Sequence, residues 1–251
     1  MNFPHTNLYK KGYQSDLIRG IDEPRPWNLT AEILRFANLH HTMLDIGSGS
    51  ASKLLPLSKH FNKIIALEPS HEMRELAQET ITNNKTTNIE IIEGYANNLP
   101  FQDNTFELVT CMLAPCDIDE VFRVLKPGGI FINETIGAAD KIEFKKEFGK
   151  DEQNNWRGQF LQFTPEDFIK FQQENYQKKF SDIKIENGFW ATYYTKQGLI
   201  ELCQHTPTIK NFALTKDEEY LNKAIAKCTT DKGIKLIQNR LLITAKKNPI
   251  N

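Results

Sequence analysis

The chain has 251 residues, of which 39% are hydrophobic and 25% are charged, and 31 lysines and arginines stand against 32 aspartates and glutamates. A chain of this length and composition can bury a core of its own without disulfides or structural metals. The formal net charge of -1 excludes the broad positive field of proteins that bind nucleic acid unselectively, so a nucleic-acid partner is not expected.

The four cysteines form no Cys-x-x-Cys pair and lie near no histidine cluster in the sequence; they are Cys111, Cys116, Cys203 and Cys228. Neither a zinc site nor a disulfide framework is therefore predicted, and no metal is expected. The first ten residues lack the basic and apolar regions of a secretory leader, and no stretch approaches the roughly 18 apolar residues that span a bilayer. We expect a soluble, cytoplasmic protein without membrane contact.

Apolar residues recur at helical spacing over residues 29–38, behind Asn28, which can cap the first turn of a helix. Strands and helices then alternate up to about residue 136. Strands are predicted at 42–47, 63–68, 89–94, 106–112 and 129–134, and helices at 51–60, 73–83 and 118–125. This alternation predicts an α/β fold with a parallel sheet and helices on both faces.

The pattern loosens after residue 137, where polar, charged and glycine-containing sequence indicates an insertion or cap. Pro165 at a first helical position predicts a helix over 164–177, and two further strands are predicted at 180–186 and 240–245. Aromatic residues of this half can wall an apolar pocket for a small molecule, although most are expected to be core: Trp156, Phe160, Phe163, Phe171, Phe189, Trp190, Tyr193 and Tyr194.

A glycine-containing turn follows the first strand of the alternation. The sequence Asp45-Ile-Gly-Ser-Gly-Ser-Ala51 places Gly47 and Gly49 where the backbone must reverse sharply or come close to a ligand. A dinucleotide fingerprint would need a third glycine at position 52, which is Ser52, and this argues against a nicotinamide cofactor. A tight turn without any ligand is the alternative interpretation.

Glu68 is the last residue of the second strand, and Pro69 stops that strand. A carboxylate at this position can accept hydrogen bonds from both hydroxyls of a ribose. In a doubly wound sheet the carboxyl ends of the first two strands border the crevice where nucleoside ligands bind. Together with the glycine turn, Glu68 therefore predicts a nucleoside-binding site.

Four segments in this order resemble the motifs of class I S-adenosylmethionine-dependent methyltransferases, and most closely their type 11 branch: residues 43–51, 66–70, 93–101 and 121–129. Residues 180–186 and 240–246 are similar to the closing antiparallel strand pair of that family. The resemblance implies a Rossmann-like, doubly wound sheet of seven strands, mostly parallel with an antiparallel closing strand, and S-adenosyl-L-methionine as the cofactor.

Carried over residue by residue, the resemblance implies that the glycine turn holds the methionyl end of the cofactor, that Glu68 binds the ribose and that Ala96 meets the adenine. The residues after the fourth strand are expected to line the place where the methyl group meets its acceptor. The complete set of expected cofactor contacts is Asp45, Gly47, Ser48, Gly49, Glu68, Pro69, Ala96, Asn97, Cys111 and Met112.

This chain departs from the family at Tyr95, where the family commonly carries an aspartate that accepts from the adenine amino group. Asn97 or a backbone carbonyl is expected to substitute for that carboxylate. No spacing singles out a catalytic base; His5, Tyr13 and Asp117 are the candidates if the acceptor must lose a proton. Pro115-Cys116 is similar to the Pro-Cys of cytosine-C5 methyltransferases, but the flanking residues do not follow those families.

The predicted activity is methyl transfer to an O, N or C atom of a small molecule. The alternatives are a non-catalytic S-adenosylmethionine-binding regulator, an RNA methyltransferase and an NAD-dependent oxidoreductase. We interpret residues 1–251 as a single domain. Its expected parts are a lid at 1–27, a cofactor-binding core at 28–136, a substrate cap at 137–238 and the last strand and tail at 239–251.

Overall fold

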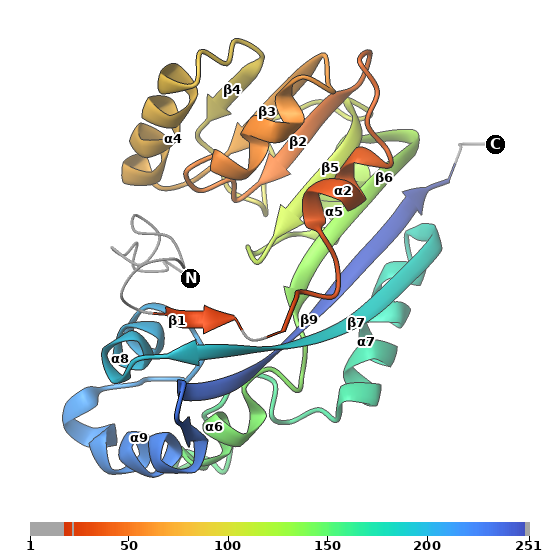
Figure 1. The fold of residues 1–251 in the computed structure, drawn as a ribbon. Helices are drawn as coiled ribbons and strands as arrows, with labels where there is room; N and C mark the ends of the chain where they lie inside the picture. The colour runs from red at the N-terminus through yellow and green to blue at the C-terminus, as the bar shows by residue number, and fades with distance from the viewer. Residues whose placement is uncertain (1–17, 22, 249–251) are drawn as a thin grey trace. The chain divides into compact units, whose positions relative to one another are not determined.

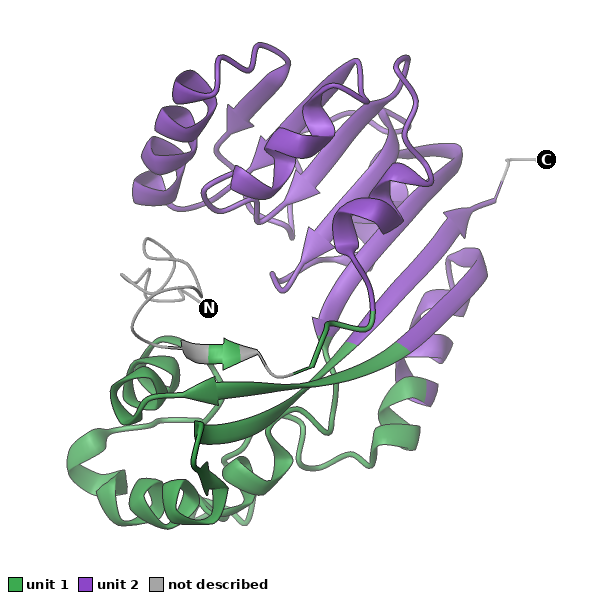
Figure 2. Ribbon diagram, in the orientation of Figure 1, with its two compact units in different colours: residues 1–26, 136–169, 187–240 green, residues 27–135, 170–186, 241–251 purple. Residues whose placement is uncertain are grey.

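A computed structural model describes residues 18–21 and 23–248 of the chain (Figure 1). The chain divides into two compact units (Figure 2). Unit 1 comprises residues 1–26, 136–169 and 187–240, and unit 2 comprises residues 27–135, 170–186 and 241–251. The single-domain interpretation stays a prediction, and residues 1–17 of the expected lid lie outside the described residues.

The strands of unit 2 form a parallel sheet. They are β2 (Thr42–Ile46), β3 (Lys63–Leu67), β4 (Ile89–Ile92), β5 (Phe106–Met112) and most of β6 (Leu125–Ile136). β2 pairs with both β3 and β5, β3 pairs with β4, and β5 pairs with β6, always in parallel. Nearly every residue of β2 and β3 is buried, as expected for strands covered on both faces.

The two long strands β7 (Phe180–Tyr194) and β9 (Gly233–Lys247) each contribute residues to both units. Along the described residues the strand order is β1-β7-β9-β6-β5-β2-β3-β4, where β1 (Ile18–Ile21) pairs antiparallel with β7 and β8 (Thr229–Thr230) pairs antiparallel with β9. Figure 1 shows β9 running opposite to β6. The α/β class and the seven predicted strands are confirmed, and β1 and β8 add to them.

Three helices of unit 2 begin at side chains that cap their first turn. Asn28 accepts from the Ala31 N–H ahead of α2 (Leu29–Leu34), and Ser70 accepts from the Met73 N–H ahead of α4 (His71–Asn83). Asp117 caps α5 (Ile118–Val124) in the same way. α4 buries Met73, Ala77 and Ile81 at a spacing of four residues, which sets its apolar face against the sheet.

Two helices are shorter than the sequence predicts. α2 ends at Leu34 because the next N–H groups, those of Phe36 and Ala37, bond to carbonyls three residues back. The helix predicted at 51–60 is a short 3₁₀ turn, η1 (Ser52–Leu54), followed by α3 (Leu55–Ser58). Pro56 lies in the first turn of α3, where its missing N–H is tolerated.

Unit 1 holds a second core around three helices that the sequence analysis does not predict: α6 (Ile142–Lys146), α8 (Lys196–His205) and α9 (Leu214–Cys228). The helix predicted at 164–177 is confirmed as α7 (Pro165–Gln177), and its first residues also belong to unit 1. Buried residues of this core include Phe144, Phe148, Leu199, Leu202, Leu221 and Leu236. Within residues 18–21 and 23–248 no helix has the length and apolarity that crossing a membrane requires.

The aromatic residues predicted to be mostly core divide as follows. Trp190, Tyr193 and Tyr194 on β7 are buried, and Phe160 and Phe163 are half-buried. The exposed ones are Trp156, Phe171 and Phe189.

Candidate cofactor site

The turn after β2 adopts a backbone conformation that favours glycine. Gly47 has φ 72° and Gly49 has φ 57°, and Ala51 follows with φ 56°. A Cβ built on Gly47 would lie 2.3 Å from the Cβ of Ala114, closer than two carbon atoms can approach. Gly47 is therefore required both by the left-handed conformation and by the close packing of the loop after β5.

The turn is tied to the end of β3 by hydrogen bonds. The N–H groups of Gly47 and Ser48 both donate to the Leu67 carbonyl, at 2.8 and 3.1 Å. The N–H of Gly49 donates to Oε2 of Glu68 at 2.9 Å. Gly49 of the glycine turn and Glu68, which are 19 residues apart in the sequence, are therefore in direct contact.

Glu68 is 5% exposed and its carboxylate is held from two sides. Oε2 accepts from Gly49, and Oε1 accepts from the N–H of Ser70 at 2.9 Å. Each carboxylate oxygen has a further lone pair, so Glu68 is fixed in orientation and can still accept from a ligand. The carbonyl of Pro69 accepts from Nη1 of Arg74 at 2.8 Å, which fixes the start of α4 beside it.

Asp45, inside β2, is 1% exposed and accepts from Oγ1 of Thr110 on β5 at 2.6 Å. Burial raises the pKa of Asp45 to about 6; the Thr110 hydrogen bond and Lys53 oppose this shift, and the charge of Glu68 adds to it. Two buried carboxyl groups, one at each of two neighbouring strand ends, thus make this edge of the sheet acidic.

Ser48 provides a test of whether these residues suit a cofactor. Its hydroxyl is buried and finds no hydrogen-bond partner among the described residues, and buried polar groups in proteins are rarely left unpaired. Ser48 lies in the turn between Gly47 and Gly49, and the N–H of Gly49 donates to the Glu68 carboxylate. A polar ligand at this turn would supply the missing partner, so the residues fit a cofactor with polar groups.

The expected adenine contacts follow β4, whose end lies beside the end of β3: the N–H of Glu68 donates to the carbonyl of Ile92 at 3.0 Å. Ala96 is half-buried, and Asn97 and Tyr95 are exposed. Tyr95 is 57% exposed, and its carbonyl accepts from the Asn98 N–H at 3.2 Å.

Cys111 and Met112 end β5 and are both buried. The Cys111 thiol donates to the carbonyl of Ala114 at 3.3 Å, so it supports the loop that packs on Gly47. Hydrogen bonding with Cys116 and burial raise the pKa of Cys111, and the same hydrogen bond lowers the pKa of Cys116. All four cysteines are free.

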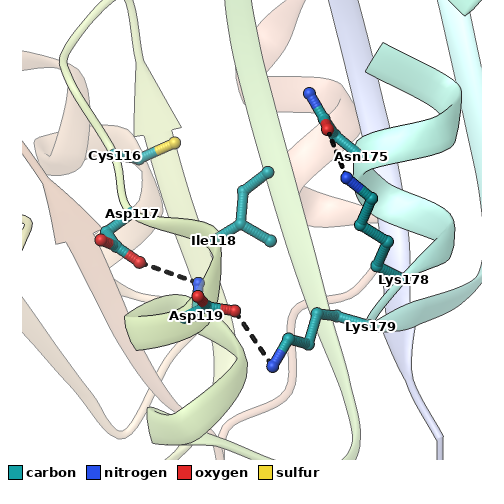
Figure 3. A pocket seen from close by; sticks show the side chains of 7 residues that line it. All are labelled: Cys116, Asp117, Ile118, Asp119, Asn175, Lys178 and Lys179. Carbon is teal, nitrogen blue, oxygen red and sulfur yellow. Dashed lines mark hydrogen bonds and ion pairs between the residues drawn. The ribbon is translucent and has the colours of Figure 1, made fainter. Parts of the chain in front are cut away.

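A hollow of about 340 Å³ adjoins this loop (Figure 3). It is lined by Cys116, Asp117, Ile118, Asp119, Asn175, Lys178 and Lys179. Oδ1 of Asp117 accepts from the N–H groups of Asp119 and Glu120 at 2.9 and 3.2 Å, so this candidate base is engaged as a helix cap. His5 and Tyr13, the other two candidates, lie outside the described residues.

The expected contact residues therefore lie at or beside the carboxyl ends of four neighbouring strands, β2, β3, β4 and β5. The sequence reading missed Thr110, Ser70 and Ala114, which position Asp45, Glu68 and Gly47 respectively. Ser70 carries a signal that could have found it, because a serine just before a helical pattern is a common cap. In the part of the chain that the structure describes, no group of three or more His, Cys, Asp or Glu residues could hold a metal ion.

The fold is that of known methyltransferases. The crystal structure of YcgJ from Bacillus subtilis superposes with a TM-score of 0.63 at 18% identity, covering 88% of this chain and 98% of that one. Phosphoethanolamine N-methyltransferase 2 of Haemonchus contortus, solved in complex with S-adenosyl-L-methionine, gives a TM-score of 0.54 at 18% identity, covering 88% and 53%. The chain has the Rossmann-like fold of this class of enzymes.

Sequence comparison agrees with the fold. The uncharacterized methyltransferase YcgJ of B. subtilis is 32% identical over 99 residues, which are 37% of this chain and 39% of the relative. Demethylmenaquinone methyltransferase of Shouchella clausii is 27% identical over 133 residues, 49% of this chain and 57% of the relative. The matches thus span less than two thirds of the length of these curated relatives.

The family model of the type 11 methyltransferase domain matches residues 44–133, the stretch that carries the glycine turn, Glu68 and the ends of β4 and β5. Over this stretch the chain is similar to the type 11 branch of class I S-adenosylmethionine-dependent methyltransferases. The resemblance predicted from the sequence is thus confirmed for residues 44–133.

Proposed function

We propose that the protein uses S-adenosyl-L-methionine to methylate a small molecule at an O, N or C atom. The observation that supports the proposal is the direct contact of the glycine turn with Glu68, because an adenosyl ligand would use both the backbone of such a turn and a carboxylate. The printed names of relatives support it, since the matched enzymes include demethylmenaquinone methyltransferases. A small-molecule partner and a cytoplasmic location belong to the same proposal.

The roles of the residues follow from their geometry. The Ser48 hydroxyl, which lacks a partner among the described residues, would bond the methionyl end. Glu68, already oriented by Gly49 and Ser70, would accept from the ribose hydroxyls. Ala96 and Asn97 would border the adenine. Asp45 would set the charge beside the turn, and Cys111 and Met112 would hold the loop after β5.

When bound, the cofactor supplies a methyl group on a positively charged sulfur, which is an activated leaving group. The protein must therefore chiefly align the acceptor and exclude water. A dedicated base is needed only where the acceptor atom must lose a proton. We assign no catalytic residue, because Asp117 serves as the cap of α5.

The test uses the purified full-length chain. Calorimetry with S-adenosylmethionine, its demethylated product and NAD should show heat with the first two and none with NAD. Methyl-labelled cofactor is then incubated with panels of phenols, amines, quinols and RNA, and label should appear in a small molecule. Absence of binding to both sulfur compounds at millimolar concentration would overturn the proposal, as would label in RNA alone. Binding without turnover on any acceptor would favour the non-catalytic regulator.

A further inference from the structure

Unit 1 buries a cluster of charged side chains outside the cofactor site. Asp140 and Lys141 precede α6, Lys145 lies within α6, and Arg240 lies on β9. Their exposed fractions are 2%, 4%, 1% and 6%. Charged residues are almost never buried to this extent unless they are paired, so the partner of each charge decides what the cluster can do.

Asp140 is the carboxylate at the centre of the cluster. Its Oδ2 accepts from Nζ of Lys141 at 2.8 Å, and its Oδ1 accepts from Nη1 of Arg240 and from the N–H of Asn239 at 3.1 Å. Burial opposes the ionisation of Asp140, but the charges of Lys141, Arg240 and Lys145 lower its pKa below the usual range. The carboxylate is thus ionised and already shared by two cations in direct contact.

Lys145 has no such contact. Its ammonium donates to a neutral group, the carbonyl of Gln159, at 2.6 Å, and no ion pair of Lys145 is formed within the described residues. The pKa of Lys145 is lowered to about 8, mainly by burial; Asp140 opposes this shift, and the charges of Lys141 and Arg240 contribute to it. A buried cation that lacks its own counter-ion is costly to keep.

The other buried carboxylate of unit 1 does not compensate for Lys145. Asp217 receives Nη1 and Nη2 of Arg157 at 2.7 and 2.9 Å and the N–H of Ala213 at 2.9 Å. This bidentate pair is self-contained, so the positive charge around Asp140 is not cancelled from that side.

The positive charge extends from the cluster toward the surface. The Arg240 guanidinium lies 5.5 Å from the ring centre of Trp190, and that of the exposed Arg25 lies 5.1 Å from the same ring. The backbone of Lys141 is in the left-handed region, with φ 50°. A residue with a side chain rarely adopts this conformation, and such strain is concentrated at functional sites.

We propose that the cluster binds an anionic group, a carboxylate or a phosphate, with Lys145 as its counter-ion. Lys141 and Arg240 would flank the group, and Arg25 and Trp190 would mark its approach. We further infer that the methyl acceptor itself carries this anionic group, and this second inference rests on the proposed function. The binding of the anion does not depend on that step.

The test measures the melting temperature of the full-length chain with increasing inorganic phosphate or acetate, against potassium chloride at equal ionic strength. One of the two anions should raise the melting temperature saturably. Which of them does so separates phosphate from carboxylate recognition. No rise beyond that of chloride for either anion would overturn the inference.

Variants assign the effect to the cluster. Lys145→Met keeps an unbranched apolar side chain but removes the ammonium, and it should weaken anion binding at least tenfold. Lys145→Arg keeps the charge and should retain most of the binding. Lys146→Met is the matched control, because Lys146 is the next residue of α6 and is 49% exposed. Equal anion binding by Lys145→Met and wild type would also overturn the inference. If Lys145→Met fails to fold, the titration of wild type against potassium chloride still decides, because the absence of a rise in melting temperature beyond that of chloride overturns the inference.

Calorimetry with S-adenosylmethionine on the same samples keeps the two proposals apart. Cofactor binding without anion binding contradicts the cluster alone. Anion binding without cofactor binding contradicts the proposed activity, and with it the step to an anionic acceptor.

Discussion

The N–H of Gly49 and Oε2 of Glu68 lie 2.9 Å apart, and this hydrogen bond joins the glycine turn after β2 to the end of β3. The same carboxylate receives the N–H of Ser70 at the start of α4. Three segments of unit 2 therefore meet at one buried side chain, and the shape of the cofactor site depends on it.

Replacing Glu68 should weaken cofactor binding. Hydrogen bonds to a charged group contribute about 1.5 to 3 kcal/mol, so Glu68→Ala should raise the Kd for S-adenosylmethionine by roughly one to two decades. Glu68→Gln keeps one acceptor oxygen and should raise this Kd by less than Glu68→Ala does. Calorimetry measures both, and Glu75→Gln, on the exposed face of α4, is the control. A Kd for Glu68→Ala equal to that of wild type would contradict the assignment.

Gly47→Ala should be markedly destabilising, and Gly128→Ala isolates the cause. Both glycines have positive φ, 72° and 80°, and both substitutions carry the strain of the left-handed region, about 1 to 2 kcal/mol. Only Gly47 faces Ala114 at 2.3 Å, whereas nothing lies within 4 Å of a Cβ on Gly128. Urea unfolding should show that Gly47→Ala lowers the free energy of unfolding by about 1 to 3 kcal/mol more than Gly128→Ala does. Equal losses would mean that the contact with Ala114 is unimportant.

Asp45 makes folding dependent on pH. Because burial raises its pKa from 3.8 to about 6, the folded chain holds the proton more tightly than the unfolded chain. Stability therefore falls as the pH rises from 3.8 to 6, by roughly 3 kcal/mol in all. Asp45→Asn keeps an acceptor for Thr110 and should abolish this decrease in stability with pH.

Urea unfolding of Asp45→Asn and wild type at pH 5 and pH 8 measures the effect. The variant should be more stable than wild type at pH 8, and its advantage should shrink at pH 5. Asp231→Asn, at an exposed position, is the control. An advantage that is the same at both pH values would show that the charge of Asp45 is not its cause.

Tyr95 stands where the family commonly has an acceptor for the adenine amino group. Tyr95→Asp should tighten cofactor binding about fivefold to tenfold, a value below that of a buried charged hydrogen bond because the position is 57% exposed. Tyr95→Asn offers a neutral acceptor and should gain less, and Tyr95→Phe should change little. Weaker binding by Tyr95→Asp would show that this chain recognises adenine in another way.

The first half of the fold could be predicted because its signals are local. Buried apolar runs mark β2 and β3, Gly47 and Gly49 mark the turn, and Pro69 marks the end of the strand. These features depend on residues within a few positions of one another. Their meaning as a cofactor site followed from the order of the motifs.

The second half depends on contacts between distant residues. A strand is predicted at 180–186, yet β7 continues through Asn187 and Gly188 to Tyr194. Both residues accept hydrogen bonds from Nδ2 of Asn239, at 2.5 and 3.1 Å, and this keeps them in the strand. The buried cluster was invisible for the same reason, because Asp140 and Arg240 are a hundred residues apart.

The chain alternates between the two units, so neither unit can be separated from the other by a single cut. The chain passes from one unit to the other after residues 26, 135, 169, 186 and 240, and two of these points lie inside β7 and β9. Neither unit corresponds to an uninterrupted stretch of gene, so neither can be moved to another protein by one recombination event. The two units therefore have to be inherited together.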